Sequence, residues 1–484
     1  MLSQKESKNE VKDYFCPKGY PLIGQIPNIN GNFLLFMENF WKEHGDHVCV
    51  DLGVRKMRLI VHPEDVKHVC IKNIDNYYKD YGILKEFLGD GLLLSHGAQW
   101  KKQRRLMNPM FTRKSMKDYV GVMQNAALRL LKRWESFNMS EPFNMLHELT
   151  YVTQDVIASA MFSEALGEQV EELCHALEVA MKCLDKQMLM PKFMTRLPLP
   201  NNRRFRKASR LVRERMEAII DEHIKYPEKY DDLLTLLLQA KDPETGESMS
   251  REDIIDEVST IFFAGHETTA NTLAWAFFML DKHPEVAEKV YREVDEVLGD
   301  DLPGLEEVQK LKYTRMVIDE VLRLFPVAWM VSRTAKEEDI LPTGYRIPKG
   351  QTVNVAPYLT HRHPDFWEEP DKFWPERFSS ENSKQIHKSA YYPFLMGQRI
   401  CIGNHFSLLE APLILAMIVQ RYKAHLVPGE KVEIKPMATL RPNPGLPMFL
   451  EKRTDKAPKV DFGLPTNTAQ AASGCPFHSE QSAA

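Results

Sequence analysis

Several features that would assign a chain to a simple functional class are missing from these 484 residues. Lys and Arg number 63 and Asp and Glu number 67, so the net charge of −4 lacks the positive excess typical of a nucleic-acid-binding protein. No apolar run reaches the roughly 20 residues that cross a bilayer. The charged start MLSQKESKNEVKDYF is neither a signal peptide nor a membrane anchor. These absences predict a soluble, cytoplasmic protein that binds no nucleic acid.

Paired cysteine motifs are also absent. The seven cysteines form no CxxC pair, which argues against a zinc ribbon, a thioredoxin-like site and a cysteine-ligated iron–sulfur cluster. Scattered thiols in a large chain are typical of an intracellular protein. The composition, 43% hydrophobic and 27% charged, is that of an ordinary globular protein and excludes collagen-like, disordered and disulfide-scaffold classes.

Helical spacing of apolar residues dominates what is present. It predicts helices over 118–135, 165–184, 208–224, 250–281, 284–298 and 313–325. Short strands are expected over 47–52, 58–61, 344–347 and 352–355. Gly, Pro and Asn interrupt residues 19–37, which predicts a loop there. The fold class is therefore mainly α, with one large helical domain and a small β-rich region.

No repeat and no linker divides the body of the chain. A single domain is expected over residues 17–460, after a polar N-terminal segment over 1–16. The tail over 461–484 is rich in small and polar residues and is expected to be disordered.

The helix expected over 250–281 carries polar residues in an apolar middle. Ser250 and Asp253 resemble a capping box at its start. Its centre, IFFAGHETTANTLAWAFF, places Glu267 and Thr268 among apolar side chains. A buried acid and hydroxyl cost free energy unless they are used or hydrogen-bonded. The block is therefore either a functional site or the solvent-facing stripe of an ordinary helix.

Five residues of the segment FLMGQRICIG match one known pattern. Phe394, Gly397, Arg399, Cys401 and Gly403 stand at every fixed position of the haem-binding loop FxxGxRxCxG. An apolar helical stretch follows, and a helix N-terminus stabilises a thiolate through its dipole and free N–H groups. The segment resembles the cytochrome P-450 family of haem-thiolate monooxygenases. A buried structural cysteine is the alternative for Cys401.

This resemblance implies that the chain binds haem b and that Cys401 is the axial ligand of its iron, because a thiolate ligand favours O–O cleavage. Gly397 and Gly403 are expected to let the backbone approach the flat macrocycle, where a Cβ would collide. Arg399 is expected to bind a haem propionate, and Phe394 to pack beside the sulfur and screen it from water.

Two further segments resemble propionate-binding elements of the same family. Trp100 and Arg104 match WxxxR, and residues at this spacing share one face of a helix. Arg333, in WMVSRTA, stands where the family has another propionate-binding arginine. All three residues are expected beside the cofactor.

The segment AGHETT matches the oxygen-binding groove AGx[DE]T of the family. The resemblance implies that Gly265 leaves room for dioxygen and that Glu267 and Thr268 organise the protons for oxygen activation. An acid and a hydroxyl are what a proton relay in a dry pocket needs.

A charge network is expected behind the haem loop. Glu320 and Arg323 match ExxR, a spacing that by itself is most often a weak surface ion pair. Arg377, in PERF, matches the third partner that the family buries with this pair. The resemblance gives the three residues a structural role.

The implied function is a monooxygenase that inserts one atom of O2 into an apolar small molecule. The segment GDGLLLSHGAQWKKQRRLMNPMF resembles the branch that contains fatty-acid hydroxylases and also oxidises terpenes and steroids. The Met-rich stretch over 181–194 aligns with the family's substrate lid, although Met side chains also fill cores.

Electrons are expected from NAD(P)H through an external reductase, of the ferredoxin, flavodoxin or flavoprotein type, because no flavin-domain sequence follows. Lys101, Lys102 and Arg105 point away from Trp100 and Arg104 and are expected to steer an acidic donor. A solvated face without a partner is the alternative for these three cations.

Two other functions are alternatives for a haem protein of this kind. A peroxide-driven peroxygenase or isomerase is disfavoured, since that branch typically lacks the acid–Thr pair that Glu267 and Thr268 provide. A non-enzymatic haem sensor or carrier would need neither a relay nor a substrate pocket.

Overall fold

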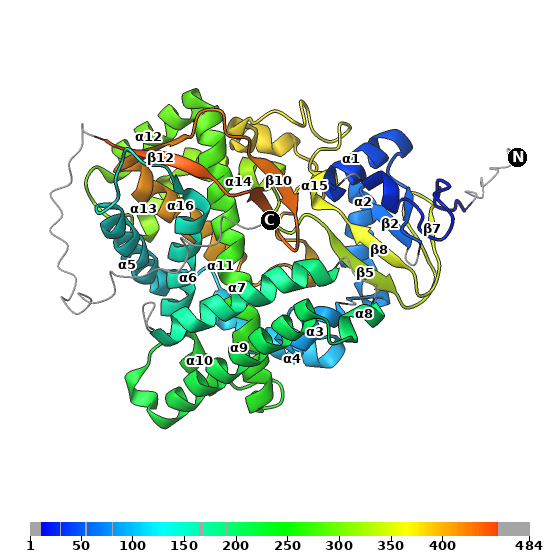
Figure 1. Cartoon of the computed structure of the whole chain (residues 1–484), viewed down its shortest axis with the longest axis horizontal. Helices are drawn as coiled ribbons and strands as arrows, with labels where there is room; N and C mark the ends of the chain where they lie inside the picture. Colours follow the sequence, from blue (N-terminus) through cyan, green and yellow to red (C-terminus); the bar gives the residue numbers. More distant parts are fainter. Residues whose placement is uncertain are drawn as a thin grey trace, which may run out of the picture.

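The computed structural model describes residues 11–29, 31–53, 56–79, 81–163, 168–188 and 192–453. Helices account for most of them, and small sheets lie at two edges of the helical body, which confirms the mainly α fold class (Figure 1). No helix in these ranges is long and apolar enough to cross a membrane.

The helices in chain order are α1 (Phe33–His44), α2 (Pro63–Lys67), α3 (Gly82–Leu88), α4 (Gly97–Met107), α5 (Met116–Trp134), α6 (Met145–Phe162), α7 (Glu168–Met188), α8 (Lys192–Arg196), α9 (Pro200–Lys225), α10 (Leu233–Gln239), α11 (Arg251–Lys282), α12 (Pro284–Leu298), α13 (Leu305–Lys310), α14 (Lys312–Leu324), α15 (Pro357–Thr360) and α16 (Asn404–Val419). Short turns used below are η2 (His68–Lys72), η6 (Pro375–Phe378) and η8 (Gly397–Arg399).

The largest sheet has the strand order β1-β2-β8-β5-β3, in which β2 and β8 are parallel and the other neighbours antiparallel. Its strands are β1 (Cys49–Asp51), β2 (Lys56–Ile60), β3 (Tyr77–Tyr78), β5 (Val331–Ala335) and β8 (Thr352–Val355). The smaller sheets comprise β4 (Phe143–Asn144), β12 (Pro447–Lys452) and β9 (Tyr422–Leu426); β10 (Glu433–Pro436) with β11 (Leu440–Asn443); and β6 (Asp339–Ile340) with β7 (Arg346–Ile347).

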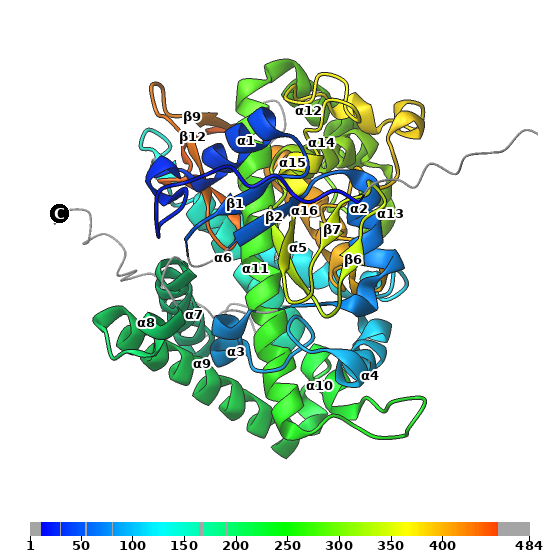
Figure 2. The same ribbon diagram turned by 90° about the vertical axis from the view of Figure 1, so that its right-hand side faces the viewer.

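The long helix α11 runs through the middle of the molecule, as both ribbon views show (Figures 1 and 2). Its 32 residues span about 48 Å. The predicted capping box is present: the Asp253 N–H donates to Ser250 Oγ at 3.1 Å, and the Ser250 N–H donates to Asp253 Oδ2 at 3.2 Å. Neighbouring α5, α6, α14 and α16 contribute to the same hydrophobic core, which holds α11 in the middle of the molecule.

Each helix predicted from the sequence is found, with ends that differ by a few residues; α9 begins eight residues earlier than expected. The structure also has helices and strands outside the predicted ranges, among them α1, α6, α10 and the strands β9 to β12. α6 carries apolar residues on nearly every side, so its periodicity is weak. The loop expected over 19–37 is wrong at its end, because α1 begins at Phe33 with Asn32 as its N-cap.

The N-terminal segment expected to be separate joins the main body from residue 11 onward. Tyr14 is buried, and its hydroxyl donates to the Leu59 carbonyl at 3.0 Å. The Cys49 N–H donates to the Phe15 carbonyl at 2.8 Å, which adds this segment to the edge of β1. The tail over 461–484 lies outside the described residues, so its predicted disorder stays a prediction.

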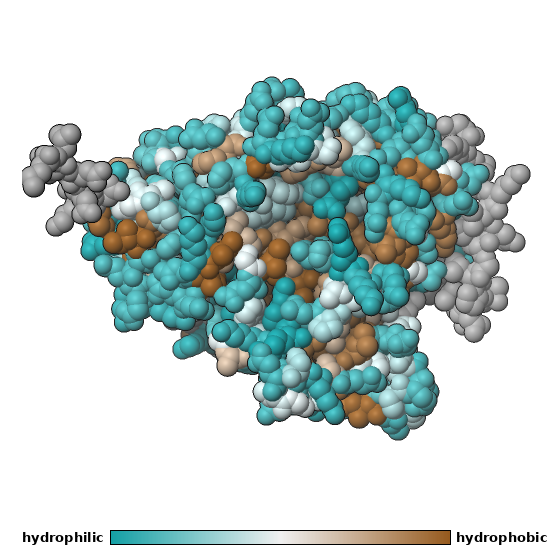
Figure 3. Space-filling model, turned by 180° about the vertical axis from the view of Figure 1, so that it is seen from behind, coloured by the Kyte–Doolittle hydropathy of each residue, from teal (hydrophilic) through white to brown (hydrophobic). Residues whose placement is uncertain are grey.

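The outer surface is mainly hydrophilic with separate hydrophobic patches on the face shown in Figure 3. Side chains of the large core stay inside, and a second, smaller core lies under the five-stranded sheet.

Candidate active site

Cys401 lies in the turn between η8 and α16. Its N–H donates to the Phe394 carbonyl at 2.9 Å, which closes the loop. The thiol is accessible, and the Gly403 N–H donates a hydrogen bond to the sulfur. Burial among protein atoms raises the pKa of this thiol, whereas the Gly403 N–H, Arg104 and Lys79 lower it. Burial is the larger effect, so the pKa of the thiol is raised overall, and the donors around this reachable sulfur offset burial only in part.

Four positive side chains converge on the same loop. Each donates to a backbone carbonyl: Lys79 to Leu93 at 2.7 Å, Arg104 to Ile400 at 3.0 Å, Arg333 to Ser332 at 2.9 Å and Arg399 to Ser95 at 3.0 Å.

These cations shift the pKa values of one another. Burial lowers the pKa of Lys79 well below its usual value, and Arg333, Arg399 and Arg104 lower it further. Burial also lowers the pKa of Arg399 to about 10, with Arg333 and Arg104 adding to the shift. No carboxylate pairs with any of the four within the described part of the chain. A cluster of desolvated cations without counter-charges favours an anionic ligand.

The middle of α11 carries the residues that match the oxygen-binding groove. Ala264 is accessible and Thr268 partly so, although α11 crosses the core. Thr268 Oγ1 donates to the Ala264 carbonyl at 2.9 Å. Thr269 Oγ1 lies 3.4 Å from Ser407 Oγ on the first turns of α16. This contact packs α11, one residue beyond Thr268, against α16, the helix that follows the Cys401 loop.

Glu267 points toward the hairpin of β10 and β11 rather than toward the Thr268 hydroxyl. Thr439 Oγ1 donates to Glu267 Oε1 at 2.5 Å, and Arg441 Nη1 lies 3.7 Å from the same oxygen. The Glu267 side chain is 15% exposed. Its carboxylate is therefore held in place without being sealed from solvent.

Glu320, Arg323 and Arg377 form the predicted charge network. Arg323 Nε and Nη2 donate to the two Glu320 oxygens at 2.7 and 2.8 Å, and both side chains are fully buried. Arg377 Nε lies 3.6 Å from Glu320 Oε1. Arg323 also donates to the carbonyls of His361 and Pro370 at 2.8 and 2.6 Å. The network thus joins α14 to the chain segment that leads into the haem loop.

Comparison with known proteins adds the deciding observation. Residues 16–448 match the family described as Cytochrome P450. The chain belongs to the cytochrome P450 family. It is therefore a P450 monooxygenase, and this family uses haem b with electrons that come from NAD(P)H through a reductase.

Two bacterial proteins and one solved structure illustrate what this P450 is similar to. It is 35% identical over 459 residues to the cyclooctatin synthase of Streptomyces melanosporofaciens, which covers 93% of this chain and 98% of that protein. It is 35% identical to the bifunctional cytochrome P450/NADPH–P450 reductase 2 of Bacillus subtilis (strain 168), across 88% of this chain and 41% of that longer protein. The crystal structure of the cytochrome P450DA heme domain matches with a TM-score of 0.85 at 28% identity, covering 92% of this P450 and 98% of that chain.

The residues of the site fit a haem. The thiol of Cys401 can ligate iron, and the four cations without carboxylate partners match the two propionates of a haem b. Trp100 and Arg104 lie on α4 as predicted, and Trp100 is buried beneath the Arg399 guanidinium. Lys79 was missed, because no motif surrounds it in the sequence.

Two glycines have close protein neighbours that explain the missing Cβ. A Cβ on Gly397, whose φ is +72°, would lie 2.6 Å from the Cys70 carbonyl oxygen, so the glycine permits close contact with η2, and its expected approach to the cofactor stays a prediction. A Cβ on Gly265 would lie 2.9 Å from Ile157 of α6. Close packing of α11 on α6 therefore explains Gly265, and its role in oxygen binding stays a prediction.

The cations expected to steer an electron donor are mostly paired within the molecule. Lys102 Nζ donates to Glu247 at 2.6 Å. Arg105 Nη2 lies 2.7 Å from Asp242, and its Nη1 lies 3.1 Å from Glu244. The predicted docking face on α4 is therefore largely neutralised by the loop that precedes α11.

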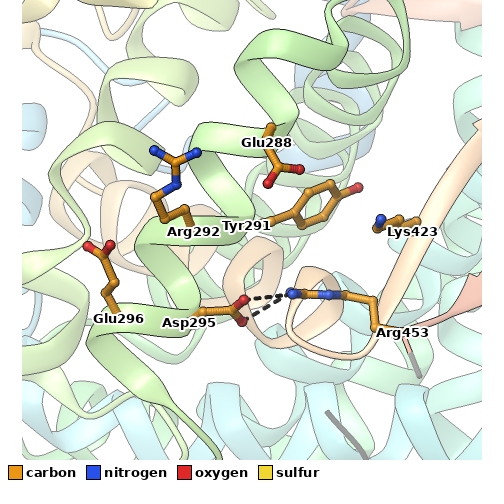
Figure 4. A pocket seen from close by; sticks show the side chains of 7 residues that line it. All are labelled: Glu288, Tyr291, Arg292, Asp295, Glu296, Lys423 and Arg453. Carbon is orange, nitrogen blue, oxygen red and sulfur yellow. Dashed lines mark hydrogen bonds and ion pairs between the residues drawn. The ribbon is translucent and has the colours of Figure 1, made fainter. Parts of the chain in front are cut away.

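A separate surface pocket lies on α12 (Figure 4), and none of the residues that line it belongs to the Cys401 loop. Asp295 and Arg453 form an ion pair of 2.7 Å across it. Its walls are otherwise charged or aromatic, and it is lined by Glu288, Tyr291, Arg292, Asp295, Glu296, Lys423 and Arg453. Such a lining is unsuited to an apolar substrate.

Proposed function

We propose that this P450 hydroxylates an apolar terpene-type molecule at a haem held by Cys401. The observation that carries the proposal is the accessible Cys401 sulfur at the start of α16, faced by four cations that donate only to backbone carbonyls. Haem bound there supplies oxygen activation, in which one oxygen atom enters the substrate and the other leaves as water.

The protein's own groups hold and orient that cofactor. The Gly403 N–H stabilises the thiolate of Cys401, and Phe394 packs against the main core next to it. Arg104, Arg333, Arg399 and Lys79 bind the propionates, and Trp100 supports Arg399 from below. Glu320, Arg323 and Arg377 keep the segment before the loop in place without touching the cofactor.

Proton supply is assigned to α11. The Thr268 hydroxyl donates to the Ala264 carbonyl at 2.9 Å, so its oxygen stays free to accept a hydrogen bond from a proton donor in the site. The Glu267 carboxylate is partly exposed, so it can take a proton from water and release it toward the groove.

Terpene chemistry is the substrate class with the most support. Besides the relatives named above, this P450 is similar to two further proteins whose names point to terpenes. They are the cyclooctat-9-en-7-ol 5-monooxygenase of Streptomyces melanosporofaciens and the pentalenene oxygenase of Streptomyces avermitilis, at 33% and 30% identity. The contact between α11 and α3 is aromatic: the ring centre of Phe263 lies 5.9 Å from that of Phe87, in edge-to-face geometry. Apolar side chains in this part of the molecule are compatible with a hydrocarbon substrate.

A separate acidic electron donor is proposed to dock near the start of α5. Arg113, Lys114 and Lys117 are exposed there, and no acidic partner contacts them in the described ranges. Tyr119 packs its ring 5.3 Å from that of Phe406, which brings this end of α5 against the helix that follows the thiolate loop. Three free cations beside the haem loop are better placed to attract a donor than the paired Lys102 and Arg105.

The test combines spectroscopy with turnover. One sample of the purified protein is reduced under carbon monoxide, and a separate aerobic sample is incubated with NAD(P)H, a ferredoxin and its reductase, and panels of cyclic terpenes, fatty acids and steroids. We expect the red-shifted Soret band of a thiolate complex, loss of that band in Cys401→His, and NAD(P)H-dependent hydroxylation of a terpene. Product formed only with added hydrogen peroxide would instead support a peroxygenase, and fatty acids as sole substrates would overturn the terpene assignment.

A further inference from the structure

Arg441 stands between the lid helix α7 and the acid Glu267 of α11. Its Nη2 lies 2.5 Å from Asp185 Oδ2 on α7, and its Nη1 lies 3.7 Å from Glu267 Oε1. One guanidinium therefore contacts a carboxylate from each helix. The sequence motifs assign no role to Arg441 or Asp185.

The hairpin that carries Arg441 is fixed to the core. Trp275 of α11 donates from Nε1 to the Leu440 carbonyl at 3.1 Å, and Trp329 donates from Nε1 to the Met437 carbonyl at 3.0 Å. Both indoles are buried. Because each indole holds one side of the turn, the hairpin is a rigid arm from which Arg441 projects.

The same hairpin sets the direction of Glu267. Thr439 Oγ1 donates to Glu267 Oε1 at 2.5 Å, the oxygen that also faces Arg441. Asn271 Nδ2 donates to the Glu267 carbonyl at 2.9 Å and lies 3.4 Å from Thr439 Oγ1. The acid is therefore oriented by Thr439 and Arg441, not by the neighbouring Thr268.

Asp185 attaches α7 to this hairpin. Its side chain is 4% exposed, and it accepts from the Ala438 N–H as well as from Arg441. Burial raises the pKa of Asp185, Arg441 lowers it and Glu267 raises it again. The two carboxylates thus act on each other through the cation between them.

We propose that Arg441 is a positioning residue for Glu267 and that Asp185 makes this positioning depend on where α7 lies. The inference rests on the proposed function, in which Glu267 supplies protons. With α7 in place, Asp185 binds the guanidinium closely and the Glu267 carboxylate stays free to take up and release a proton. When α7 moves away, Arg441 pairs with Glu267 alone and holds its carboxylate. Glu267 therefore delivers protons only when α7 closes the substrate site.

The test compares Arg441→Met, Arg441→Lys, Glu267→Gln and the double variant Glu267→Gln/Arg441→Met. The quantity measured is hydrogen peroxide released per NAD(P)H consumed with a bound substrate. Arg441→Met should raise this ratio about threefold or more, within the range of coupling between contacting residues. Arg441→Lys should restore most of the coupling, because it keeps the charge. In the Glu267→Gln background, Arg441→Met should add no further change.

The outcomes separate this inference from the proposed function. Full coupling in Glu267→Gln would remove the acid's role and with it the proposed function's proton supply. Uncoupling in Glu267→Gln with normal coupling in Arg441→Met would overturn only the role of Arg441. An equal effect of Arg441→Met in both backgrounds would show that it acts without Glu267, which also overturns the inference.

A second readout needs neither turnover nor electron donor. The hydrogen-exchange rate of the α7 backbone amides should rise in Arg441→Met and in Asp185→Asn by a similar factor. The double variant Asp185→Asn/Arg441→Met should show no additional rise. Protection of α7 that is unchanged in both single variants would mean that the ion pair does not hold the helix.

Discussion

The guanidinium of Arg399 lies 3.9 Å from the centre of the Trp100 indole ring, at the edge of the haem site. The same guanidinium donates from Nη1 to the Ser95 carbonyl at 3.0 Å. A buried ring face below and a carbonyl at one end leave its remaining N–H groups directed outward. Arg399 is therefore held in place before any anion binds, partly by its contact with Trp100.

Replacing Trp100 by Leu should weaken haem binding. A partly desolvated cation–π contact contributes about 1–2 kcal/mol, so haem transfer to apomyoglobin should become roughly 5 to 30 times faster. Trp100→Phe keeps an aromatic face and should lie between Leu and the native protein. Equal transfer rates for all three proteins would show that the ring does not position Arg399.

Glu320→Ala should strongly destabilise the fold. It leaves Arg323 fully buried without its carboxylate, a change that costs about 3–5 kcal/mol. The expected result is little soluble haem-loaded protein and a much lower urea midpoint. Glu369→Ala breaks an exposed ion pair with Lys372, with side chains 54% exposed on both sides, and should change stability by less than about 0.5 kcal/mol. Similar behaviour of both variants would contradict the structural role of the network.

Thr268→Ala should divert electrons from product to hydrogen peroxide while leaving substrate binding unchanged, because the hydroxyl is placed at the site and is not needed for packing. Thr272 offers a matched control one turn later, since its Oγ1 donates to the Thr268 carbonyl at 3.0 Å in the same way. Thr272→Ala should remain coupled. Coupled turnover in Thr268→Ala, or equal loss in both variants, would argue against a proton role for this hydroxyl.

Reversing Arg113, Lys114 and Lys117 to Glu should slow reduction of the haem by an acidic donor. The effect should be largest at low salt and fade as the Debye length shortens toward about 8 Å. The same reversal at Arg203, Arg204 and Lys207, which are exposed on α9, should have little effect. Stopped-flow reduction rates measure both sets. Unchanged rates for the α5 variant at low ionic strength would place the docking face elsewhere.

The free energy of unfolding should fall as the pH rises toward the pKa of Glu257, a buried acid on α11. Burial raises the pKa of Glu257 to about 8, although the Leu92 N–H donates to its carboxylate at 2.9 Å. The folded protein therefore keeps this proton between the unfolded pKa near 4.5 and about 8, while the unfolded chain loses it. The unfolding free energy attributable to Glu257 decreases over that window and is lowest above it.

Glu257→Gln removes this titration. Relative to the native protein, its stability should improve steadily from pH 5 to pH 8.5 in urea unfolding. Glu296→Gln, at an exposed position on α12, should follow the native pH profile. A constant difference between Glu257→Gln and the native protein at every pH would show that Glu257 is not protonated in the fold.

Local sequence determined the helices with strong periodicity and the haem loop. Ser250 and Asp253 cap α11 through contacts three residues apart, and Cys401 is followed at once by the helix whose N-terminus stabilises its thiolate. These interactions depend on near neighbours in the chain, so spacing alone reveals them. The disordered tail and the cytoplasmic location stay predictions.

Other features depend on groups that are remote in the sequence. Lys79 joins the cation cluster because the segment after β3 meets the Leu93 carbonyl in the loop before α4, and Gly397 is needed because the Cys70 carbonyl approaches it. Lys102 and Arg105 find acidic partners across the fold, and Arg441 meets both Asp185 and Glu267. The sequence determined which residue types can do this chemistry. Tertiary structure decided which charges are paired and which face the site, because Coulomb and steric interactions depend on distance in space rather than along the chain.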